Sequence, residues 1–212
     1  MKRKAELFVF GNGGMFREVS NYILRDDLFD IVVVLEDNIN SDHANTKFSV
    51  ITEKKFFDKY EQTEVFVAVF LADVAARRRL VKFIEERLES VVFPSFNFSE
   101  YLRSAFLERG NIIMPGTIFT DENISIGSFN YFNFCSFIAH DVEIGSYNTF
   151  SPYVKVSGNC KVLTSNFFGT GCVLFPNIIV DDSSIGAGAV IKRKKVTGKI
   201  VDTSKCVYYD KR

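Results

Sequence analysis

The stretch Ile126–Val156, IGSFNYFNFCSFIAHDVEIGSYNTFSPYVKV, decides the fold because an apolar residue returns at every sixth position. The same step continues beyond this stretch without a miss. The apolar positions are Ile126, Phe132, Ile138, Ile144, Phe150, Val156, Val162, Phe168, Leu174 and Val180. A six-residue repeat is typical of a triangular parallel β-helix, in which three faces form one coil. We therefore predict a β-helix of about four coils with these side chains pointing inward.

Two other positions of the repeat fit this interpretation. Four residues after the inward positions stand mostly small or medium side chains: Asn130, Ser136, Val142, Asn148, Val154, Cys160, Asn166, Cys172 and Ile178. Directly after the inward positions come residues suited to tight corners: Gly127, Asn133, Ala139, Gly145, Ser151, Ser157 and Gly169. Ile112 and Ile118 extend the repeat in a shifted register, and IGAGAVI, Ile185–Ile191, closes it.

The first part of the chain alternates between strand-like and helix-like segments. Strands are expected at Glu6–Phe10, at DIVVVLEDN up to Glu36 and Asp37, at Glu64–Phe70 and at SVVF, and helices at Met15–Leu24 and Leu71–Leu88. Such alternation requires crossover connections and indicates a small parallel, Rossmann-like sheet. We predict an α/β domain over residues 1–95, followed by an all-β parallel β-helix with a C-terminal extension over residues 96–212.

Composition excludes several classes of protein. Lys+Arg and Asp+Glu number 26 each, so no net charge draws the whole chain to nucleic acid or to an anionic membrane. The basic and apolar N-terminus reaches only Phe10, too short for a signal peptide or a membrane span. We expect a cytoplasmic protein with no nucleic-acid or membrane partner. Cysteines 135, 160, 172 and 206 show no metal-type spacing, so we predict free, mostly buried thiols and no metal site.

His140 is the candidate catalytic residue, since it follows an inward residue by two positions and so lies at a corner. A neutral imidazole is a competent general base near neutral pH, and a second group must fix its tautomer. Asp141 is the nearest carboxylate in sequence, although adjacent side chains often point apart, and it then serves as a solvated turn residue. The other histidine, His43, lies in a polar stretch and is interpreted as a surface residue.

The GNGG loop, Gly11, Asn12, Gly13 and Gly14, follows a strand and precedes a helix. This arrangement aims backbone N–H groups at a helix N-terminus, which suits a phosphate, but a plain turn remains an alternative. Asp37, after the second strand, is placed to accept from a ribose or a base, or to cap a loop. A dehydrogenase is not favoured, because the third glycine of the dinucleotide-binding pattern is replaced by Phe16.

Together, VFGNGGMFREV, HDVEIG, SGNCKV and IGAGAVI resemble the sialic acid O-acetyltransferase and bacterial nucleotide-amino-sugar N-acetyltransferase family. The resemblance spans nearly the whole chain. It implies a homotrimer of left-handed β-helices that binds acetyl-CoA between neighbouring subunits. It also implies that a nucleotide-linked amino sugar is held by the N-terminal domain.

The resemblance implies a role for each candidate residue. His140 matches the catalytic base, and Asp141 is its acidic partner. Acetyl-CoA contacts fall on Asn133, Gly158, Gly171, Gly186, Gly188 and Ala189, and nucleotide contacts fall on Gly11, Asn12, Gly13, Gly14 and Asp37. The chain departs from its relatives where Met15 replaces the histidine of a Gly-Gly-His-Gly loop and where Thr149 replaces a second histidine.

The resemblance thus predicts an acetyl-CoA-dependent N-acetyltransferase that acts on a nucleotide-linked amino sugar, such as a 4-amino-4,6-dideoxyhexose, for bacterial surface glycan such as O-antigen. The expected mechanism is direct transfer of the acetyl group, with His140 as base and with a backbone N–H at a glycine corner stabilising the oxyanion. Two alternatives remain at this point. One is an O-acetyltransferase for a sialic-acid-like hydroxyl, and the other is a non-catalytic β-helix scaffold.

Overall fold

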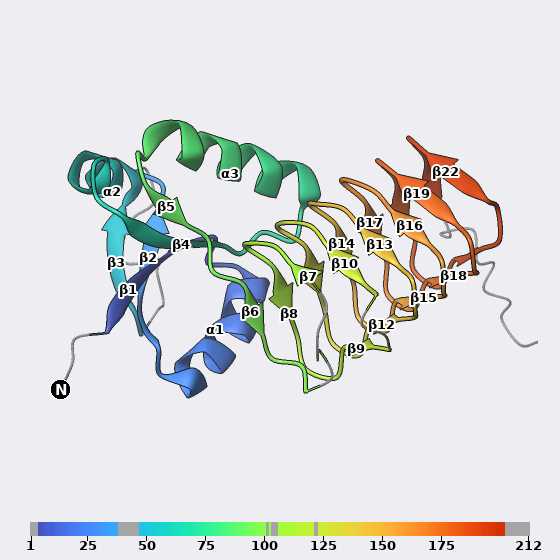
Figure 1. Ribbon diagram of the computed structural model, residues 1–212. Coiled ribbons are helices and arrows are strands. Elements are labelled where there is room, and N and C mark those ends of the chain that lie inside the picture. The colour runs from blue at the N-terminus through green and yellow to red at the C-terminus, as the bar shows by residue number, and fades with distance from the viewer. Residues whose placement is uncertain (1–3, 38–46, 101, 103–105, 121–122, 202–212) are drawn as a thin grey trace, which may run out of the picture. The chain divides into compact units, whose positions relative to one another are not determined.

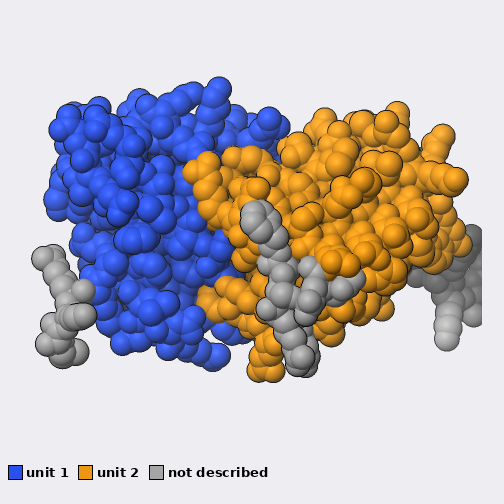
Figure 2. All heavy atoms as spheres, in the orientation of Figure 1, with its two compact units in different colours: residues 1–96 blue, residues 97–212 orange. Residues whose placement is uncertain are grey.

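A computed structural model describes residues 4–37, 47–100, 102, 106–120 and 123–201. The chain divides into two compact units, Met1–Phe96 and Asn97–Arg212, which Figure 2 shows in different colours. Within the described residues, no helix has both the length and the apolar character needed to cross a membrane.

Unit 1 contains a five-stranded parallel sheet in the order β3-β2-β1-β4-β5. Its elements are β1 (Ala5–Phe10), α1 (Gly14–Asp26), β2 (Phe29–Leu35), β3 (Ser49–Thr52), α2 (Glu53–Tyr60), β4 (Val65–Val69), α3 (Val74–Arg87) and β5 (Val91–Val92). The helix α1 lies on one face of the sheet, and α2 and α3 lie on the other (Figure 1). With both faces covered, the central strands are continuous apolar runs, as the sequence predicted.

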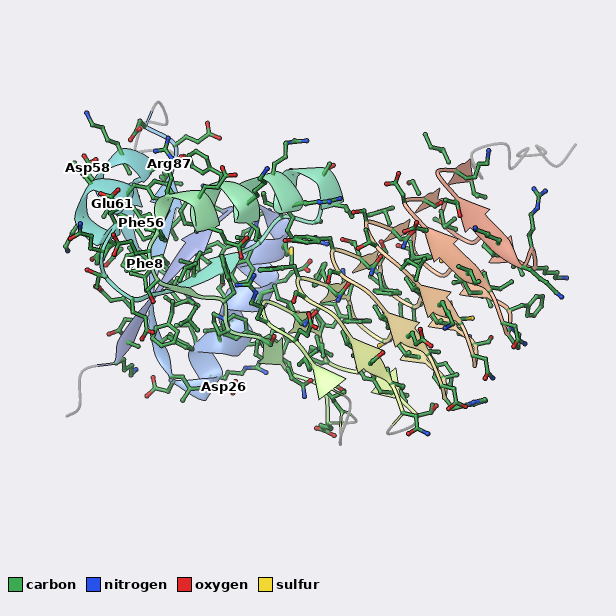
Figure 3. The ribbon with its side chains drawn as sticks, turned by 45° about the horizontal axis from the view of Figure 1, so that its top comes forward. Phe8, Asp26, Phe56, Asp58, Glu61 and Arg87 are labelled. Atoms are coloured by element: carbon green, nitrogen blue, oxygen red, sulfur yellow. The ribbon has the colours of Figure 1, made fainter. Side chains whose placement is uncertain are left out.

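Aromatic side chains fill the space between the sheet and α2. Phe56 of α2 is fully buried, and its ring lies 4.8 Å from that of Phe8 and 5.4 Å from that of Phe10 (Figure 3). The sequence did not predict β3 or α2. The strand β3 has only four residues, lies at the sheet edge and is partly exposed, so it lacks the apolar run that marked the other strands.

Unit 2 is a left-handed parallel β-helix built from three sheets (Figure 1). Sheet 1 holds β7 (Phe106–Leu107), β10 (Ser125–Ile126), β13 (Glu143–Ile144), β16 (Lys161–Val162), β19 (Ile179–Asp181) and β22 (Lys195–Thr197). Sheet 2 holds β6 (Phe96–Asn97), β8 (Ile112–Ile113), β11 (Tyr131–Phe132), β14 (Thr149–Phe150), β17 (Phe167–Phe168), β20 (Ser184–Ile185) and β23 (Ile200–Val201). Sheet 3 holds β9 (Ile118–Phe119), β12 (Phe137–Ile138), β15 (Lys155–Val156), β18 (Val173–Leu174) and β21 (Val190–Ile191). The three sheets hold six, seven and five strands, so the β-helix has more than the four coils predicted.

The interior of the β-helix follows the six-residue repeat. All ten period-six positions from Ile126 to Val180 are at most 3% exposed, which confirms the predicted inward face. The rings of Phe132, Phe150 and Phe168 stack in a column with centroid separations of 4.6 and 4.9 Å. This spacing matches the separation of neighbouring strands, so each coil contributes one ring to the column.

The repeat changes step at both ends. Near its start the inward residues are Ile113 and Phe119, and not Ile112 and Ile118, whose side chains lie on the outer side of their strands. The step from Phe119 to Ile126 is seven residues, and this extra residue moves the register by one. Beyond Val180, the inward positions Ile185 and Val196 follow steps of five residues, because two turns are one residue shorter.

The corners lie two residues later than predicted. Left-handed backbone occurs three residues after each inward position from Ile126 to Leu174, at Phe129, Cys135, Asp141, Tyr147, Tyr153, Asn159, Ser165, Gly171 and Asn177. Small residues directly after the inward positions have another cause. A Cβ atom on Gly145 would collide with the backbone carbonyl of Leu163, because the next coil passes there. Close packing of coils, and not turn geometry, requires this glycine.

The turns that lead from sheet 1 to sheet 2 carry a ladder of buried asparagines, which we call the asparagine corner: Asn111, Asn130, Asn148, Asn166 and finally Ser183. The Oδ1 atom of each asparagine accepts from the backbone N–H of the ladder residue in the next coil, at 2.9–3.0 Å. Between asparagines, the next Nδ2 donates to the same oxygen. The ladder thereby satisfies polar groups inside every turn of this corner.

Candidate active site

His140 and Asp141 form a pair in the turn between β12 and β13. The Nδ1 atom of His140 lies 2.8 Å from Oδ2 of Asp141. Asp141 has φ 56°, the left-handed conformation that Asn159 and Asn177 also adopt in the next two turns, and its carboxylate lies against the preceding ring. The structure therefore brings together the two residues that the sequence left as a possible pair. We call the turns from sheet 3 to sheet 1 the histidine corner: residues 139–142, 157–160, 175–178 and 192–194.

The pair defines which nitrogen of His140 is free to act. An ionised carboxylate only accepts hydrogen bonds, so Nδ1–H donates to Asp141 and Nε2 keeps its lone pair. Both side chains are about half exposed, so Nε2 is accessible from outside the β-helix. The arrangement suits a general base that takes a proton from an incoming nucleophile.

Gly158 lies directly against the imidazole, one coil further along the same corner. A Cβ atom at this position would lie 2.5 Å from Cε1 and 2.6 Å from Nε2 of His140. The backbone holds the two turns together, since the N–H of Asn159 donates to the carbonyl of His140 at 3.1 Å. Only glycine leaves room for the ring in this position, so Gly158 sets the location of the base.

The other residues predicted to contact acetyl-CoA lie on a different edge. Asn133, Gly171, Gly186, Gly188 and Ala189 are in the turns from sheet 2 to sheet 3, which we call the glycine corner. Gly171 and Gly188 both have φ 69°, with open space where a side chain would project. The two corners are separated by the width of sheet 3, on the order of 15–20 Å for a six-residue face. A single chain does not bring the two sets together.

Between these corners, the outer side of sheet 3 presents an apolar strip. Its apolar members Ile118, Phe137 and Val190 are 36, 37 and 53% exposed, and Val173 is partly buried. The exposed Lys155 interrupts the strip between Phe137 and Val173. Exposed residues of this type in one line mark a surface that favours contact with another apolar surface.

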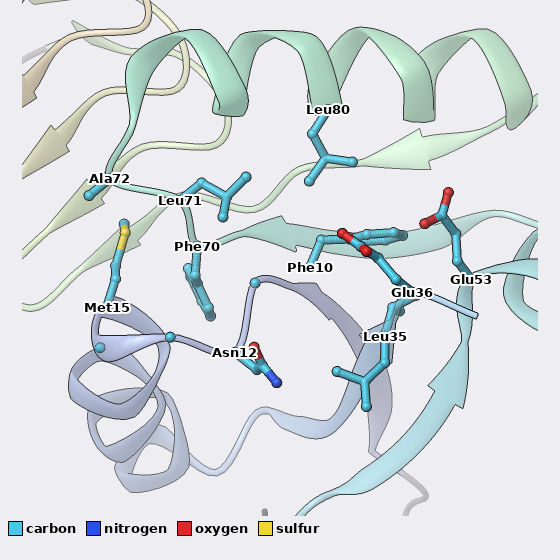
Figure 4. A pocket seen from close by; sticks show the side chains of 14 residues that line it. Phe10, Asn12, Met15, Leu35, Glu36, Glu53, Phe70, Leu71, Ala72 and Leu80 are labelled. Carbon is cyan, nitrogen blue, oxygen red and sulfur yellow. The ribbon is translucent and has the colours of Figure 1, made fainter. Parts of the chain in front are cut away.

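Unit 1 has a cavity of about 490 Å³ at the carboxyl ends of its central strands (Figure 4). The four residues of the GNGG loop, Gly11, Asn12, Gly13 and Gly14, line it. Gly11 has φ 97°, and a Cβ atom there would lie 2.6 Å from the carbonyl oxygen of Phe70. Gly13 is the N-cap residue of α1, so the loop aims free N–H groups into the cavity.

Two carboxylates that the sequence did not single out, Glu36 and Glu53, also line this cavity, from the same side (Figure 4). Burial raises the pKa of the Glu53 carboxyl, and the negative charge of Asp37 adds to that effect. Asp37 is not among the lining residues. Its Oδ1 accepts from the backbone N–H of Lys54 at 3.1 Å, in the first turn of α2, which is the capping role weighed from the sequence. Glu53 is the first residue of α2, and the sequence did not predict this helix. The sequence therefore gave no reason to place Glu53 at this cavity.

A buried arginine shapes the opposite wall of the cavity. Arg77 of α3 is 2% exposed, and its Nη1 donates to the carbonyl of Leu71 at 2.6 Å. Leu71 and Ala72 both line the cavity. The hydrogen bond from Arg77 thus fixes the loop that follows β4. In the sequence it is one of three consecutive arginines, and nothing there marks it as buried.

Other candidate groups are placed as follows. Cys160 and Cys172 are buried, and burial raises the pKa of the Cys172 thiol to about 12, whereas Cys135 is exposed. Among the described residues, no group of three or more His, Cys, Asp and Glu side chains is arranged to hold a metal ion. The predicted surface residue His43 and the fourth cysteine, Cys206, lie outside the described residues.

Comparison with known proteins gives consistent relatives. No protein-family model matches the sequence. The chain is 26% identical over 184 residues to GDP-perosamine N-acetyltransferase of Escherichia coli O157:H7, which covers 85% of this chain and 82% of the relative. The resemblance expected from the sequence is confirmed. This chain is similar to bacterial nucleotide-amino-sugar N-acetyltransferases of the hexapeptide-repeat type.

Solved structures agree on the fold. A histidine-to-asparagine variant of perosamine N-acetyltransferase from Caulobacter crescentus, in complex with CoA and GDP-perosamine, matches with a TM-score of 0.80 at 16% identity, over 97% of this chain and 98% of that one. The acetyltransferase domain of PglB from Neisseria gonorrhoeae, in complex with acetyl coenzyme A, matches with a TM-score of 0.75 at 18% identity, over 92% and 94%. The α/β unit followed by a β-helix is thus an arrangement that these nucleotide-sugar and CoA-binding proteins share.

Proposed function

We propose that this protein is an acetyl-CoA-dependent N-acetyltransferase that acetylates the amino group of a nucleotide-linked amino sugar. The observation that carries the proposal is the His140–Asp141 pair, seated against Gly158 on the outside of the β-helix. The similarity to GDP-perosamine N-acetyltransferase over 85% of the chain supports the same class of reaction. A sugar amine is accordingly favoured over a sugar hydroxyl as the acceptor.

The proposed reaction is a direct transfer. Nε2 of His140 takes a proton from the sugar amine as the nitrogen attacks the thioester carbonyl of acetyl-CoA. The C–S bond then breaks, and the imidazolium gives its proton to the leaving sulfur, so that CoA leaves as the thiol. The negative charge of Asp141 stabilises the imidazolium that forms. Raised pKa values keep the buried Cys160 and Cys172 thiols protonated, which argues against either thiol as an acyl carrier.

The cavity of unit 1 is the proposed nucleotide site. The N–H groups at the start of α1 suit a phosphate, and the two carboxylates Glu36 and Glu53 suit the donors of a ribose or a base. Asp37 acts through α2, where it caps the first turn. We propose, from this class of substrate, a role in the synthesis of bacterial surface glycan such as O-antigen, in the cytoplasm.

We further propose that the active form is a homotrimer. Its support is that the histidine corner and the glycine corner of one chain are too far apart to hold one acetyl group together. A second copy seated on the apolar strip of sheet 3 would bring its own glycine corner to the first copy's His140. Phe137→Asp with Val190→Asp should then yield monomers in light scattering and abolish transfer, while monomers with full activity would contradict the assembly.

The test of the function is thiol release from acetyl-CoA, measured against GDP-, UDP- and dTDP-linked 4-amino sugars and against free sialic acid. We expect turnover with one nucleotide-linked amino sugar and an amide in the product. Turnover with sialic acid alone would replace the amine by a hydroxyl acceptor. Acetyl-CoA binding with no turnover across the panel would instead support a non-catalytic scaffold.

A further inference from the structure

The first turn of α3 carries a buried cation. Arg77 is the fourth residue of α3 and is 2% exposed, whereas Arg78 and Arg79, which follow it, are exposed. An arginine side chain stays charged at physiological pH, so burying it costs solvation free energy. The start of a helix also disfavours a positive charge, because the helix dipole is positive there. Two physical preferences therefore oppose Arg77 at this position, and such local conflicts are expected where function requires a group.

The guanidinium of Arg77 binds backbone oxygens of the cavity wall in unit 1. Its Nη1 atom donates to the carbonyl of Leu71 at 2.6 Å and, in a longer bond of 3.4 Å, to the carbonyl of Ala72. Leu71 and Ala72 line the cavity, and Arg77 is not among the lining residues. The two carbonyl oxygens therefore point at a group behind the wall.

The same wall packs against the GNGG loop. The backbone N–H of Phe70 donates to the carbonyl of Phe10, the residue before Gly11, at 2.8 Å. The Cδ2 atom of Leu71 lies 3.1 Å from the place where a Cβ atom on Gly11 would stand. Leu71 and Leu80 of α3 reach the cavity from the same side (Figure 4). A shift of the loop after β4 would therefore also move the loop that presents N–H groups to the cavity.

The direction of these carbonyls matters for an anionic ligand. The N–H groups at the start of α1 attract a phosphate, whereas a carbonyl oxygen repels it, because that oxygen carries partial negative charge. Glu36 and Glu53 already bring two carboxyl groups to this cavity. By binding the oxygens of Leu71 and Ala72, Arg77 keeps two more negative groups away from the place where a diphosphate would lie.

We infer that Arg77 is a positioning residue for the nucleotide-linked sugar. It acts through the loop after β4, which it fixes with the carbonyl oxygens of Leu71 and Ala72 turned away from the diphosphate. The inference rests on the proposed function, since it takes the cavity of unit 1 as the nucleotide site. Loss of the guanidinium should weaken binding of the nucleotide and leave acetyl-CoA binding and the chemical step unchanged.

The experiment compares Arg77→Met, which removes every donor, with Arg77→Lys, which keeps the charge and a donor but loses the planar fork. Arg79→Met is the matched control, because it makes the same change at an exposed position of the same helix. Calorimetric titration would use GDP, UDP and acetyl-CoA. Steady-state kinetics would use the nucleotide-linked 4-amino sugar that the wild type acetylates, and thermal unfolding of each variant would report on folding.

We expect Arg77→Met to bind the nucleoside diphosphate about tenfold more weakly and to raise the KM for the sugar equally, as for one lost hydrogen bond to a charged group. Arg77→Lys should show about a threefold change, because one donor remains. In both variants kcat and the affinity for acetyl-CoA should match the wild type, and Arg79→Met should match it throughout.

A merely structural role for Arg77 would lower the thermal midpoint and leave the KM for the sugar unchanged in the folded protein. That result, or equal losses of nucleotide and acetyl-CoA affinity, would overturn the inference alone. Should Arg77→Met fail to fold, Arg77→Lys decides, and a KM for the sugar equal to that of the wild type would overturn the inference. A wild-type protein that transfers no acetyl group to any nucleotide-linked amino sugar would overturn the proposed function itself.

Discussion

The asparagine corner and the histidine corner belong to the same β-helix, yet they use the repeat in opposite ways. The asparagine corner places the same amide in successive coils, and each member bonds to the next. The histidine corner has His140, Gly158, Pro176 and Arg193 in succession, with no residue repeated. One corner is buried and satisfied internally, whereas the other is exposed and has groups that suit an external molecule.

This difference separates stability from function within one fold. A backbone that repeats needs the same side chain wherever the requirement is internal hydrogen bonding. Side chains that differ from coil to coil along an exposed edge suit a ligand whose chemical groups also differ along its length, such as an extended cosubstrate. We therefore expect substitutions in the asparagine corner to change stability and substitutions in the histidine corner to change activity.

The largest expected effect follows from His140→Ala. Loss of the general base should lower kcat by ~10²–10⁴-fold. The side chain is more than half exposed and contributes little buried packing, so the denaturant midpoint should hardly move. Rates of thiol release and urea unfolding curves would be measured on the same preparation. A large loss of stability would show that the histidine corner is structural as well.

Asn148→Ala should show the reverse pattern. It removes the Oδ1 atom that accepts from both the N–H and the Nδ2 of Asn166 inside the protein. Leaving buried donors without an acceptor should lower the free energy of unfolding by about 2–4 kcal/mol. The control Asn133→Ala removes an amide of the glycine corner whose Oδ1 accepts from the backbone N–H of the next residue, Phe134. It should lower the free energy of unfolding by less than about 1 kcal/mol. Equal costs would contradict a special role for the ladder.

Gly158→Ala tests whether the position of His140 is set by its neighbour. The added methyl group would meet the imidazole, which can rotate away, so we expect roughly a hundredfold loss of kcat from a displaced base and little change in stability. Gly169→Ala is the matched change, because its methyl group would meet the backbone of Ala187 in the next coil. That variant should be markedly less stable in thermal unfolding. Normal activity in Gly158→Ala would separate this glycine from catalysis.

Asp141→Asn gives the smallest effect of the set. Asparagine tolerates the left-handed backbone at this position and still accepts a hydrogen bond from Nδ1–H, but it lacks the charge. The change from a charged to a neutral partner should lower kcat by roughly tenfold and leave the KM for the sugar unchanged. Kinetics of this variant beside His140→Ala would show the order of effects. A loss as large as that of His140→Ala would mean that the carboxylate itself takes part in proton transfer.

Much of the β-helix could be predicted because its physical signal is repeated. Ten apolar positions at one spacing outweigh any single exception, whereas β3 is a single short edge strand with little to mark it. The corner offset was missed for a related reason. Gly145 marks a close approach between coils, and the sequence cannot distinguish this from a turn that needs left-handed backbone.

The candidate site could be predicted only where residues are neighbours in sequence. His140 and Asp141 are adjacent, yet whether they meet depends on one φ angle that the sequence does not state. Glu36 and Glu53 are seventeen residues apart and share a cavity only because β2 and α2 end and begin at the same edge of the sheet. The order of the strands and helices in the sheet, and not any local sequence pattern, brings them to the same cavity.

The asparagine ladder also has a consequence for how the β-helix comes apart. Each coil satisfies donors of the next, so unfolding one internal coil would break the ladder on both sides at once. Unfolding of the β-helix should therefore begin at a terminal coil and proceed one coil at a time. Ser183 ends the run of side-chain amides, and its Oγ accepts instead from the backbone N–H of Lys199 in the next coil. Fraying from the C-terminal end would therefore reach the turn that holds His140, after β12, only when the later coils have already opened.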